Sequence, residues 1–170
     1  MTQRRLVLMR HGKSGYDDAY YNDFVRRLAP RGEKDVPRVT GWLRREGLVP
    51  DLIYSSTAYR AYETALLAAR TLNYAEEAID FKRELYLAEV GALLQCIRSI
   101  PAFPTIMLIG HNPGLEGLVE ELCGRDAGRR EDGKLMATSA LAVIEMPPDW
   151  TGRLAGEGRL KALMRPADLD

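Results

Sequence analysis

Apolar positions along this chain alternate between two spacings, one typical of buried strands and one typical of helices. Short apolar runs predict strands at residues 5–9, 52–54, 105–109 and 140–146, a weaker strand at 78–81 and an edge strand at 159–164. Between these runs, apolar residues recur at three- and four-residue intervals and predict helices that begin near residues 30, 57, 90 and 113. This alternation favours the α/β class, as a three-layer α/β/α sandwich with a mostly parallel central sheet.

Residues that suit helix ends sharpen two of these boundaries. Ser56 or Thr57 can cap the helix that follows the second strand. Asn112 is a candidate N-cap for a later helix, with Pro113 at the first helical position. Each of these helices therefore starts directly after a strand and a very short turn.

Length, composition and charge exclude several classes of protein. The chain has 170 residues, of which 46% are apolar, and we expect one domain over residues 1–165 with a short loose tail at 166–170. Basic and acidic residues number 24 each, so neither nucleic acid nor an anionic membrane surface is an expected partner. No apolar stretch approaches the ~20 residues of a membrane span or forms a signal peptide, which predicts a cytoplasmic protein. Cys96, Cys123 and two histidines form no recognisable metal-binding pattern, and no metal or cofactor is expected.

Both histidines of the chain directly follow a predicted buried strand. His11 comes after Arg10 at the end of the first strand, and His111 follows the strand at 105–109. Ligands of open α/β sheets bind beyond the carboxyl ends of the strands, so neighbouring strands would place both imidazoles in one pocket. An arginine fork binds phosphate oxygens, a neutral imidazole can attack phosphorus, and Gly12 lets the backbone come close to a ligand. The pattern indicates a phosphate site, although a solvated loop histidine would have the same local sequence.

A third segment with the same features leads from residues 55–57 into a helix. Arg60 lies in the first turn of that helix, from which its guanidinium can reach the strand-end crevice. It could equally pair with Glu63, three residues further on, across the helix surface. The residues by themselves leave both interpretations open.

Taken together, these segments resemble the histidine phosphatase (phosphoglycerate-mutase-like) superfamily. The resemblance is carried by Arg10-His11-Gly12, by Ser56-x-x-x-Arg60-Ala61-x-x-Thr64 and by Gly110-His111-Asn112. Within the superfamily the chain is most similar to the small phosphohistidine phosphatases of the SixA type. That likeness extends over Leu8-Met9-Arg10-His11-Gly12-Lys13-Ser14, Arg27-Leu28-x-x-x-Gly32, Leu85-Tyr86 and Gly110-His111-Asn112-Pro113-Gly114-Leu115, within residues 6–146.

The resemblance implies a role for each of the main site residues. His11 would be the nucleophile that becomes transiently phosphorylated, while Arg10, Arg60 and His111 would bind the phosphoryl group and stabilise its charge. Phosphoryl transfer depends mainly on positioning and electrostatic stabilisation, which these side chains can supply without a metal. We also place Gly12, Ser14 and Asn112 among the substrate-binding residues.

The general acid is the uncertain part of this site. Phosphomonoesterases of the superfamily protonate the departing alkoxide with a carboxylic acid, and SixA-type members resemble this chain in lacking one at the usual position. Glu84 and Glu89 are the nearest carboxylates, and Asp17, Asp18 or Asp23 of the first loop could swing inward. A missing acid favours a phosphohistidine substrate on a phosphotransfer protein, because phosphorylated imidazole is a better leaving group than an alkoxide. The alternatives are a small-molecule phosphomonoesterase and a non-catalytic module that binds phosphate or a phosphoprotein.

The loop at 12–29 is rich in aromatic residues. Tyr16, Tyr20, Tyr21 and Phe24 could form a rim for a partner protein. Two of them could instead pack against the core of the domain. The sequence does not separate these possibilities.

Overall fold

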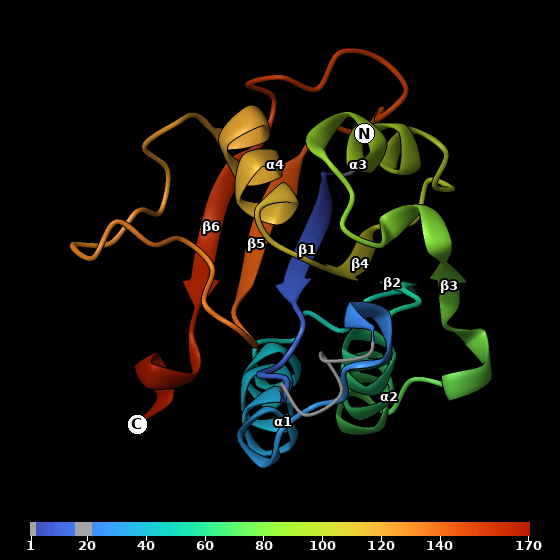
Figure 1. Cartoon of the computed structure of the whole chain (residues 1–170). Coiled ribbons are helices and arrows are strands. Elements are labelled where there is room, and N and C mark those ends of the chain that lie inside the picture. The colour runs from blue at the N-terminus through green and yellow to red at the C-terminus, as the bar shows by residue number, and fades with distance from the viewer. Residues whose placement is uncertain (1–2, 16–21) are drawn as a thin grey trace.

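A computed structural model describes residues 3–15 and 22–170 of the chain. Within these residues, six strands form one sheet in the order β3-β2-β4-β1-β5-β6 (Figure 1). The strands are β1 (Arg4–Arg10), β2 (Leu52–Ser56), β3 (Asp80–Lys82), β4 (Thr105–Gly110), β5 (Leu141–Met146) and β6 (Arg159–Met164). Strands β3, β2, β4 and β1 run parallel, whereas β5 and β6 are antiparallel to their neighbours. The predicted α/β class with a mostly parallel sheet is confirmed.

Helices cover both faces of the sheet. They are α1 (Pro30–Arg45), α2 (Tyr59–Leu72), α3 (Val90–Arg98) and α4 (Gly114–Cys123), with short 3₁₀ helices η1 (Asp23–Val25), η2 (Glu76–Ala78), η3 (Arg83–Leu85) and η4 (Pro166–Leu169). Helices α1 and α2 lie against one face, and α3 and α4 against the other (Figure 1). In the described part of the chain, every helix is too short or too polar to cross a lipid bilayer.

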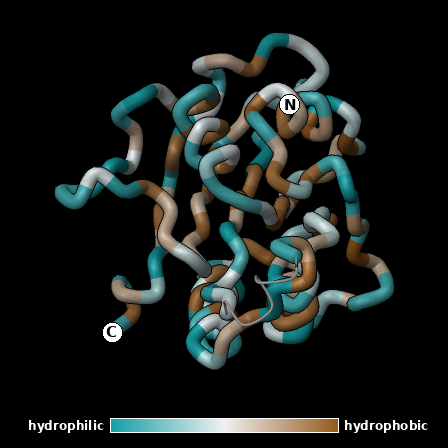
Figure 2. The backbone as a smooth tube through the Cα atoms, viewed as in Figure 1, coloured by the Kyte–Doolittle hydropathy of each residue, from teal (hydrophilic) through white to brown (hydrophobic). Residues whose placement is uncertain are grey.

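The period-two alternation of the strands explains why there are two helical layers. Val7 and Met9 of β1 belong to the apolar cluster under α1 and α2, whereas Leu6 and Leu8 belong to the cluster under α3 and α4. Successive side chains of a strand point to opposite faces, so a wholly apolar run needs cover on both sides. Figure 2 shows this apolar interior as brown segments along the central strands.

Helix α2 packs against the sheet through small side chains. Ala61, Ala65, Ala68 and Ala69 are fully buried on one stripe of the helix, as their spacing predicts. Short side chains let the helix backbone approach the sheet closely. The first turn of α2 is thereby fixed next to the carboxyl end of β2.

Both predicted helix caps are wrong. Helix α2 begins at Tyr59 with Ala58 as its N-cap, because Ser56 is still part of strand β2. Helix α4 begins at Gly114 with Pro113 as its N-cap, after a cis peptide bond between Asn112 and Pro113. The Asn112 side-chain amide donates a hydrogen bond to a carbonyl of another loop instead of capping the helix.

The C-terminal residues 166–170 contact the rest of the domain. Pro166 is buried, and Pro166–Leu169 form the 3₁₀ helix η4. Asp168 forms an ion pair with Arg130, and Asp170 forms one with Arg38 of α1. These contacts tie the end of the chain to its neighbours.

The sheet register brings the polar strand ends together. Arg10 pairs with Gly110 across β1 and β4, so His11 and His111 leave the sheet side by side. Strand β2 lies on the other side of β4 and ends at the same edge. Because β5 is antiparallel to β1, the residues that precede it, 136–140, reach this edge as well.

Candidate functional site

A hollow of about 270 Å³ lies at this edge of the sheet. Six of the seven predicted site residues line it: Arg10, His11, Ser14, Arg60, His111 and Asn112. The rings of His11 and His111 are 5.2 Å apart between centroids. Residues separated by more than a hundred positions in the sequence therefore share one pocket.

His11 is held with one ring nitrogen facing the pocket. Its Nδ1 lies 2.7 Å from the Gly12 carbonyl oxygen, which can only accept a hydrogen bond, so Nδ1 carries the proton. Nε2 is then unprotonated and lies 3.3 Å from Nε of Arg60, which donates to it. Burial, assisted by the charges of Arg60 and Arg10, lowers the pKa of His11 to about 3. The imidazole is therefore neutral at physiological pH, the form that can act as a nucleophile.

His111 is oriented by a buried serine. Its Nε2 lies 2.7 Å from the Ser56 hydroxyl oxygen, which also accepts the Ala58 backbone N–H at 3.3 Å. This pairing is satisfied most fully if the hydroxyl donates to Nε2, which leaves the ring proton on Nδ1. Nδ1 is buried and has no hydrogen-bond partner within the described residues. Burial and the charge of Arg60 lower the pKa of His111 to about 4, so it is a neutral donor.

Arg60 is buried at the bottom of the pocket. Its two terminal nitrogens donate to the Asp23 backbone oxygen at 2.9 Å and to the Asp23 carboxylate at 3.1 Å. Glu63, the alternative partner on the same helix, instead accepts the backbone N–H of Leu28. The sequence left two interpretations of Arg60 open. In the structure the Arg60 side chain faces the crevice at the strand ends.

Asp23 is the carboxylate that faces this pocket in the described part of the chain. It pairs with Arg60 and with Arg26, and it accepts a hydrogen bond from the Tyr86 hydroxyl at 2.6 Å. Partial burial raises its pKa, but the hydrogen bond from Tyr86 and the charge of Arg60 outweigh it, and the pKa of Asp23 falls below its ordinary value. The carboxylate is therefore ionised at neutral pH.

Two of the other candidate acids belong to the described residues. Glu84 and Glu89 are exposed and do not line the pocket. Asp17 and Asp18 fall outside the described residues. The aromatic residues Tyr16, Tyr20 and Tyr21 of the same loop fall outside them too.

Gly12 is packed between groups of helices α1 and α2. Its N–H donates to the Thr64 hydroxyl at 3.0 Å, and that hydroxyl donates in turn to the Arg60 carbonyl at 2.7 Å. A Cβ at Gly12 would lie 3.0 Å from side-chain atoms of Leu28 and Val36. The missing side chain thus allows close packing against helix α1, and the N–H bond ties the turn after β1 to helix α2. A contact between Gly12 and substrate stays a prediction.

The segment at residues 136–140 completes the pocket, although nothing in its sequence pattern indicates this. The Met136 carbonyl accepts hydrogen bonds from Arg10 at 3.1 Å and from Asn112 at 2.9 Å, and Thr138 lines the hollow. The Ser139 N–H donates to the His11 carbonyl at 3.0 Å. An antiparallel β5 is the reason this segment reaches the site, and the apolar pattern of that strand does not reveal its direction.

The assembled groups are suited to a tetrahedral oxyanion. Two guanidinium groups supply positive charge and forked donors, and two neutral imidazoles face the same hollow. Within the described residues, no three histidine, cysteine or acidic side chains are arranged to hold a metal ion. Arg10, Arg26, Arg60 and Lys13 are the cationic side chains in the described lining of the pocket.

Comparisons of the sequence with known proteins give a consistent family. The model of the histidine phosphatase superfamily (branch 1) matches residues 6–93. An uncharacterised chloroplastic protein of Arabidopsis thaliana is 35% identical, and the match covers 96% of this chain and 78% of the relative.

The fold is similar to that of several solved structures. The protein histidine phosphatase SixA, complexed with tungstate, has a TM-score of 0.82 and 24% identity, with 98% of this chain and 99% of that chain covered. A structure from Agrobacterium tumefaciens assigned to phosphohistidine phosphatase SixA has a TM-score of 0.78 and 27% identity, covering 98% and 100%. A mycobacterial glucosyl-3-phosphoglycerate phosphatase has a TM-score of 0.66 and 16% identity, covering 94% and 98%. The same fold thus serves phosphatases with different substrates.

Proposed function

The chain belongs to the histidine phosphatase superfamily, and we propose that it is a metal-independent phosphatase that hydrolyses phosphohistidine on a phosphotransfer protein. The observation that carries the proposal is the state of His11. Its neutral ring presents an unprotonated Nε2 to a pocket that contains Arg10, Arg60 and His111. This geometry supports attack on a bound phosphoryl group.

The reaction proceeds in two transfers. In the first, Nε2 of His11 attacks phosphorus, the bond from phosphorus to the substrate imidazole breaks, and the phosphoryl group becomes attached to His11. In the second, water attacks phosphorus, the bond to His11 breaks, and inorganic phosphate leaves as the His11 imidazole is restored. Nδ1 stays protonated throughout and donates its hydrogen bond to the Gly12 carbonyl oxygen. This bond fixes the ring and stabilises the positive charge that develops on the imidazole.

The remaining pocket residues stabilise the transferring group. Arg10 and Arg60 bind its equatorial oxygens, and Nδ1–H of His111 supplies a further hydrogen bond. Nδ1 of His111 is buried and has no hydrogen-bond partner among the described residues, which supports this role because an oxyanion would satisfy it. Ser14 and Asn112 also line the pocket, which supports a role for both in contacting the substrate.

The state of Asp23 supports a nitrogen–phosphorus bond as the target. An alkoxide leaving group needs a protonated acid, whereas Asp23 is held ionised by Tyr86 and Arg60. A phosphorylated imidazole that is protonated on its free nitrogen leaves as a neutral imidazole without such an acid. The runner-up function is a small-molecule phosphomonoesterase, in which bound phosphate would raise the pKa of Asp23 enough to make it the acid.

The test compares phosphate release from three substrates with and without a chelator. These are a phosphotransfer protein phosphorylated on histidine, phosphoimidazole and a panel of phosphomonoesters. We expect release from the phosphoprotein, unaffected by the chelator. Turnover confined to monoesters would select the runner-up, and phosphate binding without any release would mean a binding module.

The nucleophile is tested separately by His11→Gln. This variant is expected to lose turnover on every substrate and to lose the acid-labile phosphate that forms on the wild-type enzyme. Substantial turnover by His11→Gln would remove His11 from the mechanism. Ser55→Ala serves as the control, because Ser55 is equally buried but bonds only to backbone carbonyls.

A further inference from the structure

Three exposed apolar side chains lie at the phosphoryl pocket or in the hollow next to it. Among the described residues, the large apolar side chains that are most exposed are Val49 at 42%, Tyr59 at 42%, Tyr62 at 44%, Leu87 at 52% and Phe103 at 44%. Leu87 lines the pocket, and Tyr59 is adjacent to Arg60 in the sequence. Tyr59, Tyr62 and Leu87 are called the docking rim below.

Aromatic contacts connect the two sides of this rim. The Phe24 ring packs edge-on against Tyr59 at 6.1 Å and against Tyr86 at 5.0 Å. Tyr86 in turn contacts the His111 ring at 5.5 Å and immediately precedes Leu87. The rim is therefore continuous with the catalytic histidines.

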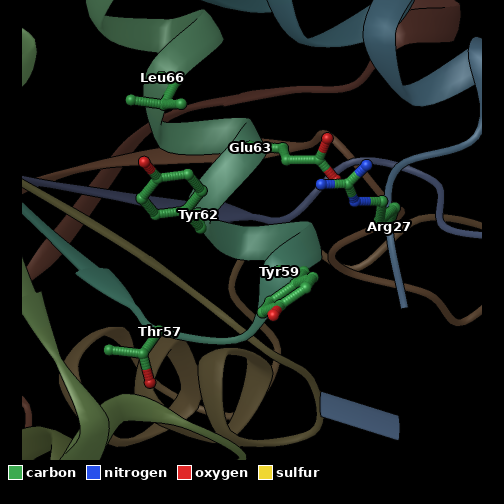
Figure 3. Close-up of a pocket in the computed structure, with 6 residues that line it drawn as sticks. All are labelled: Arg27, Thr57, Tyr59, Tyr62, Glu63 and Leu66. Atoms are coloured by element: carbon green, nitrogen blue, oxygen red, sulfur yellow. The ribbon is translucent and has the colours of Figure 1, made fainter. Parts of the chain in front are cut away.

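Helix α2 extends the rim away from the pocket. Tyr59, Tyr62 and Leu66 recur at intervals of three and four residues on the outer face of the helix (Figure 3). They line a surface hollow of about 420 Å³, with Arg27 beside Glu63 at its edge (Figure 3). A row of this spacing is the kind of ridge against which a second helix packs.

At the phosphoryl pocket, the Leu87 side chain is exposed although its backbone conformation is unfavourable. Its φ of 49° lies in the left-handed region, which costs a leucine roughly 1–2 kcal/mol. An exposed apolar side chain at a strained position brings no stability to the isolated domain. Its place at the pocket mouth supplies a reason for it.

We propose that the docking rim binds a helical face of the phosphoprotein substrate, with an acidic surface, so that its phosphohistidine enters the pocket. This inference rests on the proposed function and names the surface that selects the protein. A small ligand would be mostly enclosed by its site. The side chains of the docking rim are instead exposed to solvent, and only a large partner surface would bury them.

The charge around the mouth favours such a partner. Lys13 and Arg26 line the pocket and Arg27 borders the adjacent hollow, whereas Asp23 and Glu63 are the acidic residues among the same lining groups. With Arg10 and Arg60 inside, the described lining residues carry more positive than negative charge, although the chain as a whole is neutral. Complementary charge would steer a phosphorylated, acidic surface to this side of the molecule.

The test measures steady-state kinetics of Tyr62→Ser on two substrates that share one reactive group. One is a helical phosphotransfer domain phosphorylated on histidine, and the other is phosphoimidazole. We expect KM for the phosphoprotein to rise about tenfold, which is typical of losing an anchoring tyrosine, while kinetics on phosphoimidazole stay unchanged. Phe103→Ser is the matched control, because Phe103 is equally exposed but precedes β4 at the opposite edge of the sheet.

A second variant, Leu87→Asn, guards against an effect of misfolding. Asparagine adopts a positive φ more readily than leucine, so the midpoint of thermal unfolding should not fall. KM for the phosphoprotein should still rise more than KM for phosphoimidazole.

The outcomes separate the rim from the proposed function. Equal KM changes on both substrates, or none, would overturn the rim and leave the function standing. A Tyr62→Ser effect confined to aromatic phosphomonoesters would assign the hollow to a small leaving group and also overturn it. Failure of the wild-type enzyme to release phosphate from either phosphohistidine substrate would overturn the proposed function itself.

Discussion

Replacing Ser56 with alanine removes the hydroxyl that orients His111. Ser56 and His111 are both buried, and the hydroxyl lies 2.7 Å from Nε2 of the imidazole. Without it, Nε2 has no partner in the interior, and the ring proton is no longer directed to Nδ1. The imidazole itself remains, so the variant isolates its orientation from its presence.

The expected size of the effect follows from the bonds that are lost. A buried polar atom left unpaired costs about 1–3 kcal/mol, so the free energy of unfolding should fall by that amount. The net value of the lost hydrogen bond, about 1 kcal/mol, corresponds to a fall of roughly fivefold to tenfold in kcat/KM. Removing the donor altogether with His111→Gln should cost about 10²–10³.

Steady-state phosphate release and urea unfolding measure both quantities. Ser55→Ala is the control, because its buried hydroxyl bonds to the carbonyls of Ser56 and Ala61 and contacts neither histidine. It should lose stability but keep kcat/KM. If Ser56→Ala retains full activity, or if both serine variants lose activity equally, the hydroxyl does not act through His111.

Three further changes test other features of the site and fold. Asp23→Asn removes the carboxylate that competes with oxyanions for the buried Arg60 guanidinium. The variant should therefore bind tungstate at least ~tenfold more tightly, as measured by calorimetry. Weaker binding would contradict this competition. The pKa values of His11 and His111 are lowered to about 3 and about 4, so the unfolded chain protonates first as pH falls below about 6.5. The contribution of the two neutral histidines to the free energy of unfolding is therefore fully present above pH 6.5. It falls by about 1.4 kcal/mol per histidine per pH unit towards pH 4. Urea unfolding should show a shallower pH dependence in His111→Gln, and equal slopes would refute this. Gly114→Ala places a Cβ 2.0 Å from the Ala88 carbonyl oxygen and should lower the free energy of unfolding by ~3 kcal/mol. In Gly91→Ala the new Cβ meets no atom within 4 Å, so this control should stabilise its helix. Similar effects of the two substitutions would contradict the close packing at Gly114.

The apolar pattern was sufficient to predict most of the architecture. Each buried strand is a run that needs cover on both faces, and each helix carries its stripe at the period of the helix, so both are encoded locally. Residues 105–109 and 159–164 show this well, because the predicted strands lie within one residue of β4 (Thr105–Gly110) and β6 (Arg159–Met164). Helix starts were less predictable, because side chains such as Asn112 found distant partners.

The sequence by itself determined the chemistry available at the strand ends: two imidazoles, two arginines and the short turns that carry them. Only the tertiary structure decided which groups share the pocket and in what state. Asp23 was one of several possible carboxylates until folding placed it on Arg60, and residues 136–140 reach the site only because β5 runs antiparallel. The order and direction of strands, and the burial that keeps His11 neutral, arise from contacts between residues far apart in the chain. No local pattern encodes those contacts, because they depend on how all the layers pack at once.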